Sequence, residues 1–179
     1  MSGTIAGLSL WIGPPKGSKL DRALTEVVKH YSAELGTPVW EPHITLLGSV
    51  LASPEEALTT ITDAVKDVTP FDVPLVDIVT KDFFFQCIMA KAAENNALMS
   101  LNASLRNLYP PPNNEPFWPH LSLVYGDLEL DVKTRVCNEI KSNHDWSIVG
   151  SVVHVEVIEI WRTEGPVDSW VKVGQVSLS

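Results

Sequence analysis

The sequence predicts an α+β fold in one domain, residues 1–179, with two internal lobes. A chain of 179 residues fits one domain. Segments with helical periodicity and segments with strand-like alternation both occur, but not as a regular strand–helix–strand repeat with a glycine-rich loop. One short strand pattern also occurs twice, which suggests two related halves.

Four segments have the features of amphipathic helices. The first begins after the N-cap candidate Ser18 and ends before Gly36, with apolar residues at helical spacing between them. The second opens on Ser53, with Pro54 in the first turn and Glu56 at the capping-box position. The predicted helices are residues 18–35, 53–66, 94–108 and 131–142.

The predicted strands are short segments rich in β-branched, aromatic or alternating apolar residues. Between the third helix and the fifth strand lies a proline-rich segment, 109–119, which proline excludes from helices and central strands. We expect it to be a linker or a lid. The predicted strands are residues 4–12, 43–48, 71–79, 82–91, 120–125, 150–162 and 168–178.

Composition and charge restrict the partners. The net charge is −9, and such a surface repels long nucleic acids, whose binding depends on clustered Lys and Arg. No apolar stretch reaches the roughly 20 residues of a membrane helix. Cys87 and Cys137 suggest two reduced thiols rather than a disulfide scaffold. We expect a cytoplasmic monomer that binds a small molecule, with neither membrane nor long nucleic acid as partner.

The strongest internal repeat is a six-residue pattern of proline, histidine, aliphatic, hydroxyl, leucine and aliphatic residues. It occurs at Pro42–Leu47 and again at Pro119–Val124. Because side chains alternate along a strand, His43 and Thr45 share one face, and so do His120 and Ser122. Two such strands side by side would bring two imidazoles and two hydroxyls around one small volume.

This set of groups suits acid–base chemistry at a cyclic phosphate. Imidazoles titrate near neutral pH, so one can accept a proton while the other donates one. Hydroxyls can donate to phosphate oxygens. A single buried strand histidine is usually structural, but a matched pair with hydroxyls at the same offset favours catalysis. Two histidines without a further ligand are too few for a typical zinc site, so we expect neither metal nor cofactor.

The sequence resembles the two-histidine (2H) phosphoesterase superfamily, and more closely the plant and fungal cyclic phosphodiesterases. The resemblance rests on Trp11 with Pro14, both histidine motifs, the Asp82–Cys87 run, and Trp161-Arg162-Thr163 with Trp170. It implies a bilobal fold in which two antiparallel sheets line a central groove and helices cover the outside. It also implies hydrolysis of ADP-ribose 1″,2″-cyclic phosphate and nucleoside 2′,3′-cyclic phosphates without metal, linked to tRNA-splicing by-product metabolism.

The same resemblance assigns candidate roles to individual residues. His43, His120, Thr45 and Ser122 match the catalytic tetrad, with His120 as the base and His43 as the acid, an order that the sequence itself leaves open. Tyr125 matches a position near the phosphate. Trp11, Phe84 and Trp161 are candidates for stacking on the base or ribose.

Two alternative functions remain open from the sequence. One is action on RNA ends or 2′,5′-linked oligonucleotides within the same superfamily, which the acidic charge and the lack of a basic stripe disfavour. The other is a non-catalytic nucleotide-binding module, which the intact hydroxyls beside both histidines disfavour.

Overall fold

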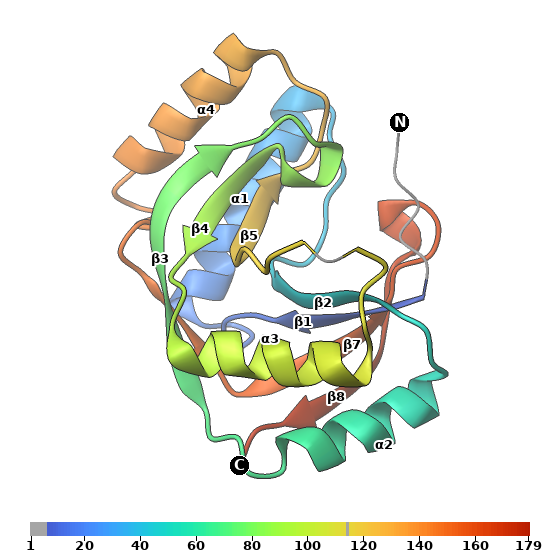
Figure 1. Ribbon diagram of the computed structural model, residues 1–179. Coiled ribbons are helices and arrows are strands. Elements are labelled where there is room, and N and C mark those ends of the chain that lie inside the picture. The colour runs from blue at the N-terminus through green and yellow to red at the C-terminus, as the bar shows by residue number, and fades with distance from the viewer. Residues whose placement is uncertain (1–6, 114) are drawn as a thin grey trace.

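The protein folds into an eight-stranded antiparallel sheet with helices on its outer side, as the computed structural model shows for residues 7–113 and 115–179 (Figure 1). The α+β prediction is therefore confirmed. The strands are β1 (Leu8–Ile12), β2 (Ile44–Val50), β3 (Phe71–Thr80), β4 (Ile88–Ala92), β5 (His120–Val124), β6 (Val152–Val155), β7 (Val157–Arg162) and β8 (Val171–Ser177).

The two predicted sheets are the two halves of this one sheet. The strand order is β6-β3-β4-β5-β2-β1-β7-β8, so each half holds four strands and one histidine motif. The halves meet where β2 pairs with β5, through Ile44 opposite Leu121. The two strands that carry the motifs are therefore central and adjacent.

Two of the helices pack against the half of the sheet opposite to the strand that each one follows. α1 (Lys19–Leu35) follows β1 but packs against β5, whereas α3 (Asn96–Leu108) follows β4 but packs against β2. α4 (Leu130–Ser142) packs against β3, and α2 (Pro54–Val65) packs against β7 and β8. Figure 1 shows α1 and α4 beside one half of the sheet and α2 and α3 beside the other. Each motif strand is thus held by a helix that arises from the opposite half.

The helix boundaries follow the capping residues closely. The side chain of Ser18 accepts a hydrogen bond from the backbone N–H of Asp21, and Gly36 ends α1 in the left-handed conformation. Ser53 and Glu56 form the predicted reciprocal capping box of α2. No helix in the described part of the chain is both long and apolar enough to cross a bilayer.

Three strand predictions need correction, and residues 4–6 of a fourth lie outside the described residues. Within the predicted strand 82–91, only Ile88–Ala92 forms β4; Phe84–Gln86 is a 3-10 turn, η1, whose phenylalanines pack against Tyr125 instead of alternating across a sheet. The predicted strand 150–162 breaks at Glu156, because β6 pairs with β3 and β7 pairs with β1 and β8. The last strand begins at Val171, after a second 3-10 turn, η2 (Val167–Ser169).

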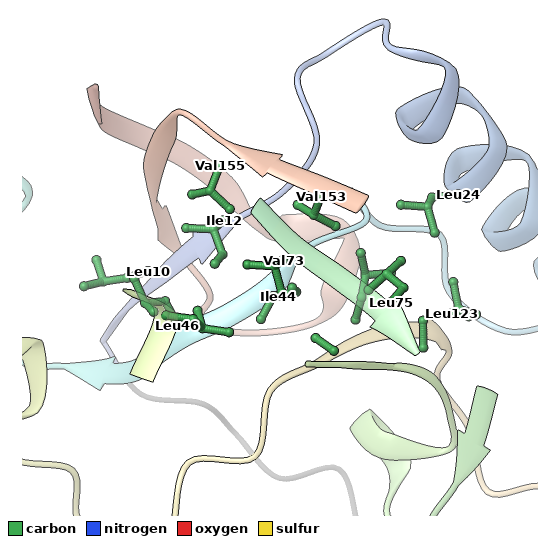
Figure 2. Close-up of a cluster of buried hydrophobic side chains, with 14 of the residues drawn as sticks. Leu10, Ile12, Leu24, Ile44, Leu46, Val73, Leu75, Leu123, Val153 and Val155 are labelled. Carbon is green, nitrogen blue, oxygen red and sulfur yellow. The ribbon is translucent and has the colours of Figure 1, made fainter. Parts of the chain in front are cut away.

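The main core lies between the sheet and its helices. Figure 2 shows its central side chains, which come from both halves of the sheet and from α1. Ile44 and Leu121, the pair at the junction, are fully buried in it. This burial fixes which face of β2 and β5 points inward, because a one-residue slip would exchange the two faces.

We expect Leu121→Ala to lower the free energy of unfolding by about 2–5 kcal/mol, the usual cost of such a cavity. Urea denaturation followed by circular dichroism measures the loss. Leu51→Ala is the control, since Leu51 is 80% exposed and its loss should change stability by no more than about 0.5 kcal/mol. Equal effects of the two substitutions would contradict the junction's place in the core.

Candidate active site

The β2–β5 junction brings the two histidine motifs together. Because Ile44 and Leu121 are paired and point into the core, their neighbours along each strand lie on the opposite face. Antiparallel register through this pair sets Thr45 opposite His120 and His43 opposite Ser122. The four predicted residues therefore share one face, and each histidine lies across from the hydroxyl of the other motif.

Each histidine is oriented by a hydrogen bond from its Nδ1 to a backbone carbonyl, and the two bonds are equivalent. Nδ1 of His43 lies 2.6 Å from the carbonyl oxygen of Glu41, and Nδ1 of His120 lies 2.9 Å from that of Trp118. A carbonyl oxygen only accepts, so Nδ1 carries the proton in each ring, and Nε2 has the lone pair when the ring is neutral. In each case the acceptor is two residues earlier, with a rigid proline between. The repeated proline was the sequence signal for this arrangement.

His43 is held from the side by a stack of aromatic rings. The ring of Trp11 lies 3.4 Å from that of His43, centroid to centroid, at an interplanar angle of 4°. Trp161 stacks on Trp11 at 4.4 Å. Since β1 lies between β2 and β7, His43 and Trp161 cover opposite faces of the Trp11 indole, which is only 2% exposed. In this structure Trp11 is therefore placed to position His43 rather than to stack on a ligand.

The indole nitrogen of Trp11 fixes this stack further. It donates a buried hydrogen bond of 2.7 Å to the hydroxyl of Ser9, two residues earlier on the same face of β1. The indole nitrogen of Trp161 likewise donates to Glu159 at 2.8 Å. Both indoles are thus anchored to their own strands.

His120 has a different neighbour on its side. Its ring lies 5.0 Å from that of Trp118, and the ammonium of Lys81 lies 3.7 Å from the Trp118 ring centroid. This is a cation–π contact. Among the described residues Lys81 forms no ion pair, whereas Lys16 near His43 is paired with Glu41 at 2.5 Å. Lys81 is therefore a cation near His120 whose charge no carboxylate neutralises in an ion pair.

Both imidazoles favour the neutral state in the ligand-free protein. Burial, helped by positive charge at His120 and Lys16 and opposed by the Glu41 carbonyl, lowers the pKa of His43 from 6.5 to about 3. Burial also lowers the pKa of His120, helped by Lys81 and opposed by the Trp118 carbonyl. Positive charge at His120 lowers the pKa of His43, so the two rings disfavour carrying a proton at the same time.

The hydroxyl groups complete the polar surface beside the histidines. Ser122 donates a hydrogen bond of 2.9 Å to the carbonyl oxygen of Phe85. Burial raises the pKa of Tyr125, and a hydrogen bond with Ser122 opposes this rise. Tyr125 reaches Ser122 because β5 ends at Val124, so strict alternation no longer applies. Thr45 is half-buried, and its side-chain hydroxyl forms no hydrogen bond within the described ranges.

An aromatic cluster closes one end of this surface. Tyr125 stacks on Trp40, with ring centroids 3.6 Å apart, and both pack with Val28 apart from the main core. The predicted residue Phe84 joins this cluster together with Phe85, Val167 and Trp170. Its members come from α1, η1, η2 and the segments that flank β2, β5 and β8, and no periodic pattern in the sequence predicts them.

The remaining donors offer no evident metal site. Within residues 7–113 and 115–179, no group of three or more His, Cys, Asp or Glu side chains is placed to hold a metal ion. Cys87 and Cys137 are both buried and free.

Comparison with known proteins agrees with the fold. A cyclic phosphodiesterase from Arabidopsis thaliana is 24% identical over 125 residues, which cover 70% of this chain and 68% of that protein. The solved structure of TT0787 from Thermus thermophilus superposes with a TM-score of 0.63 at 20% identity, covering 96% of this chain and 97% of the other.

A second solved structure, LigT of E. coli complexed with 3′-AMP, superposes with a TM-score of 0.60 at 18% identity, covering 96% of this chain and 97% of that chain. The model of the family described as "Cyclic phosphodiesterase-like protein" matches residues 6–178. With nearly the whole chain matched, the protein belongs to this cyclic phosphodiesterase-like family of 2H phosphoesterases, which are phosphodiester hydrolases.

Proposed function

We propose that the protein hydrolyses small cyclic phosphates by two-histidine acid–base catalysis, without metal. The observation that carries this proposal is the antiparallel pairing of Ile44 with Leu121, which sets both histidines and both hydroxyls on one face. The substrates we propose are ADP-ribose 1″,2″-cyclic phosphate, opened to the 1″-phosphate, and nucleoside 2′,3′-cyclic phosphates, opened to 2′-phosphates.

In the proposed reaction, water attacks phosphorus in line with the departing ribose oxygen. His120 accepts the proton of the water at Nε2, and His43 donates a proton from Nε2 to the leaving oxygen. The bond from phosphorus to water oxygen forms as the bond to ribose oxygen breaks. Thr45 and Ser122 donate to the non-bridging oxygens, where negative charge accumulates. For this, Ser122 must turn its proton from the Phe85 carbonyl to the phosphate.

The free protein leaves both rings neutral, so this order of roles requires one proton to be gained. Burial, helped by the ammonium of Lys81, lowers the pKa of His120, which keeps that ring neutral, as a base must be. His43 is buried and neutral in the free protein, so we infer that its proton is acquired with the anionic substrate. A phosphate anion in contact with a buried imidazole raises its pKa.

The negative net charge of the protein favours a small substrate over a long nucleic acid. A chain of net charge −9 repels a polyanion but can bind a small anion through a few local donors. One relative is a cyclic phosphodiesterase, and one structural neighbour was solved with 3′-AMP. We also propose that the protein acts as a cytoplasmic monomer on by-products of tRNA splicing, with Cys87 and Cys137 reduced.

Replacing either histidine should lower turnover strongly. We expect His43→Gln and His120→Gln each to lower kcat by about 10²–10⁴-fold, the usual contribution of one acid–base group. Phosphorus NMR of a panel that includes ADP-ribose cyclic phosphate, adenosine 2′,3′-cyclic phosphate and a cyclic-ended oligonucleotide gives both rate and product. The variant that lacks the acid should lose less on a p-nitrophenyl phosphodiester, whose leaving group needs no proton.

His144→Gln is the matched control, because His144 is exposed and distant in the sequence from both motifs. Thermal melting shows whether each variant is folded. Near-complete activity in folded His43→Gln or His120→Gln would refute the mechanism, and preference for the oligonucleotide would refute the substrate class.

Chelation should leave the reaction unchanged. We expect the same kcat in excess EDTA as in untreated protein, because the proposed groups transfer protons and stabilise charge without a Lewis acid. The measurement is the initial rate before and after dialysis against EDTA. A loss of rate that Zn²⁺ or Mg²⁺ restores would contradict the proposal.

The pH dependence should reflect the histidine pair. Catalysis needs one protonated and one neutral ring, and both pKa values lie below 6.5 in the free protein. We therefore expect kcat/KM, which reports the free enzyme, to be highest below pH 6.5 and to fall as pH rises. Lys81→Gln removes a charge that lowers the pKa of His120. The alkaline limb marks the pH at which the pair loses its last proton, so this limb should move to higher pH in the variant.

Lys66→Gln, at the exposed end of α2, is the control for this shift. It should leave the pH profile unchanged, because α2 packs mainly against β7 and β8 and not against the strands that carry the histidines. An alkaline limb above pH 7 in the unmodified protein, or a Lys81→Gln limb that moves to lower pH, would contradict the electrostatic account.

A further inference from the structure

The two histidines differ in the aromatic surface beside each ring. The imidazole of His43 lies parallel to the indole of Trp11, with centroids 3.4 Å apart and an interplanar angle of 4°, so the two faces are in full contact. The ring of His120 lies 5.0 Å from that of Trp118 at an angle of 29°, which is a looser contact. The two stacks are therefore not equivalent, although the motifs that carry the histidines are.

A cation already lies on one of these two indoles. The ammonium of Lys81 is 3.7 Å from the centroid of the Trp118 ring. The indole of Trp11 instead has the neutral ring of Trp161 beside it at 4.4 Å, and the nitrogen of that ring donates to the carboxylate of Glu159 at 2.8 Å. Because an indole face attracts positive charge, Trp11 can still stabilise a cation, whereas Trp118 already interacts with one.

The proposed reaction requires a proton on the histidine that burial disfavours more. The side chain of His43 belongs to a residue that is only 6% exposed, whereas His120 is half-buried. Burial penalises the charged form of an imidazole, and it is the largest cause that lowers the pKa of His43 to about 3. Burial alone therefore favours a proton on His120, which is the reverse of an acid at His43 and a base at His120.

The charged side chains near His43 do not remove this difficulty. The ammonium of Lys16 is paired with Glu41 at 2.5 Å and with Asp21 at 3.6 Å. Lys16 and a protonated His120 both lower the pKa of His43, against the effect of the Glu41 carbonyl. Within residues 7–113 and 115–179, the histidines that form ion pairs with carboxylates do not include His43. Within the protein itself, stabilisation of a proton on this ring has to come from an uncharged neighbour.

We propose that the indole of Trp11 stabilises the protonated form of His43 and thereby gives this ring the acid role. When the phosphate of the substrate binds, the pair gains one proton from solvent, and the indole face favours its place on His43 through a cation–π contact. Lys81 on Trp118 deprives His120 of the same stabilisation. After turnover His120 releases the proton of the attacking water to solvent, and His43 gains a new one.

In this proposal Trp11 acts through His43 and is a positioning residue, because it touches neither the substrate nor the reacting atoms. The inference rests on the proposed function, to which it adds the residue that sets the direction of proton transfer. Its test therefore includes a measurement of the proton affinity of His43 that does not depend on turnover.

Two substitutions of Trp11 separate this role from simple packing. Trp11→Phe and Trp11→Met leave side chains of similar size, but only phenylalanine presents an aromatic face. Trp146→Met is the matched control, because Trp146 is also a buried tryptophan beside a histidine, with its ring 5.6 Å from that of His30. Thermal melting shows whether each variant is folded.

The proton affinity of His43 is measured by NMR titration of its Cε1–H signal in saturating inorganic phosphate, with the signal identified by its loss in His43→Gln. We expect Trp11→Met to lower the pKa of His43 by about one pH unit, the size of a desolvated cation–π contact. Trp11→Phe should lower it by less, and Trp146→Met should leave it unchanged. The pKa of His120 should not fall in any of these variants.

Turnover gives a second readout. We expect kcat/KM for adenosine 2′,3′-cyclic phosphate to fall by up to about tenfold in Trp11→Met, because a smaller share of the complex carries its proton on His43. A p-nitrophenyl phosphodiester, whose leaving group needs no proton, should lose less than about twofold. Trp11→Phe should retain most of the rate on both substrates.

The results distinguish this inference from the function on which it rests. A lower pKa of His43 in Trp11→Met, in a protein that hydrolyses none of the cyclic phosphates, supports the indole's effect and refutes the proposed function. Hydrolysis with an unchanged pKa in Trp11→Met, or with equal losses in the methionine and phenylalanine variants, refutes the role of Trp11 alone. The same role is refuted if Trp146→Met shifts the pKa equally, or if His43 stays neutral beside phosphate at every pH at which the unmodified protein is active.

Discussion

The arrangement of the whole site depends on the contact between Ile44 and Leu121, where the two halves of the sheet meet. Both side chains are excluded from solvent, and their burial orients β2 and β5 together. Every polar residue of the two motifs then faces away from the core by alternation alone. Two helices reinforce this junction, since α1 packs on β5 and α3 packs on β2, each in the half opposite to the strand that the helix follows.

The sequence was sufficient for the parts of the fold governed by local rules. Ser18, Gly36 and Ser53 marked helix ends through capping, and the repeated motif located the two central strands through its period of two. It was insufficient where tertiary contacts decide: no Gly or Pro marks the break at Glu156, and the run at Phe84 has strand composition but joins an aromatic cluster. Lys81 and Trp118 were missed for the same reason, because their relation to His120 exists only in three dimensions.

The two sides of the site are similar in backbone and different in charge. Each histidine donates from Nδ1 to a carbonyl two residues earlier, which gives both rings the same tautomer. Beyond that, His43 lies deeper and Lys16 near it is paired with Glu41, whereas His120 lies near an unpaired ammonium. A similar backbone thus holds two similar groups, and burial lowers the pKa of both, helped by Lys16 at His43 and by Lys81 at His120.

The break at Glu156 also bears on when the site comes into being during synthesis. Residues 152–155 complete one outer edge of the sheet through β3, and residues 157–177 complete the other through β1. Both motif strands leave the ribosome well before either edge can form. Pairings between such distant segments make folding slow, because the chain loses the entropy of loop closure before the new contacts stabilise it. A nascent chain that already contains both histidines therefore lacks the outer strands of the sheet. The complete site can form only after residues 152–177 have been synthesised.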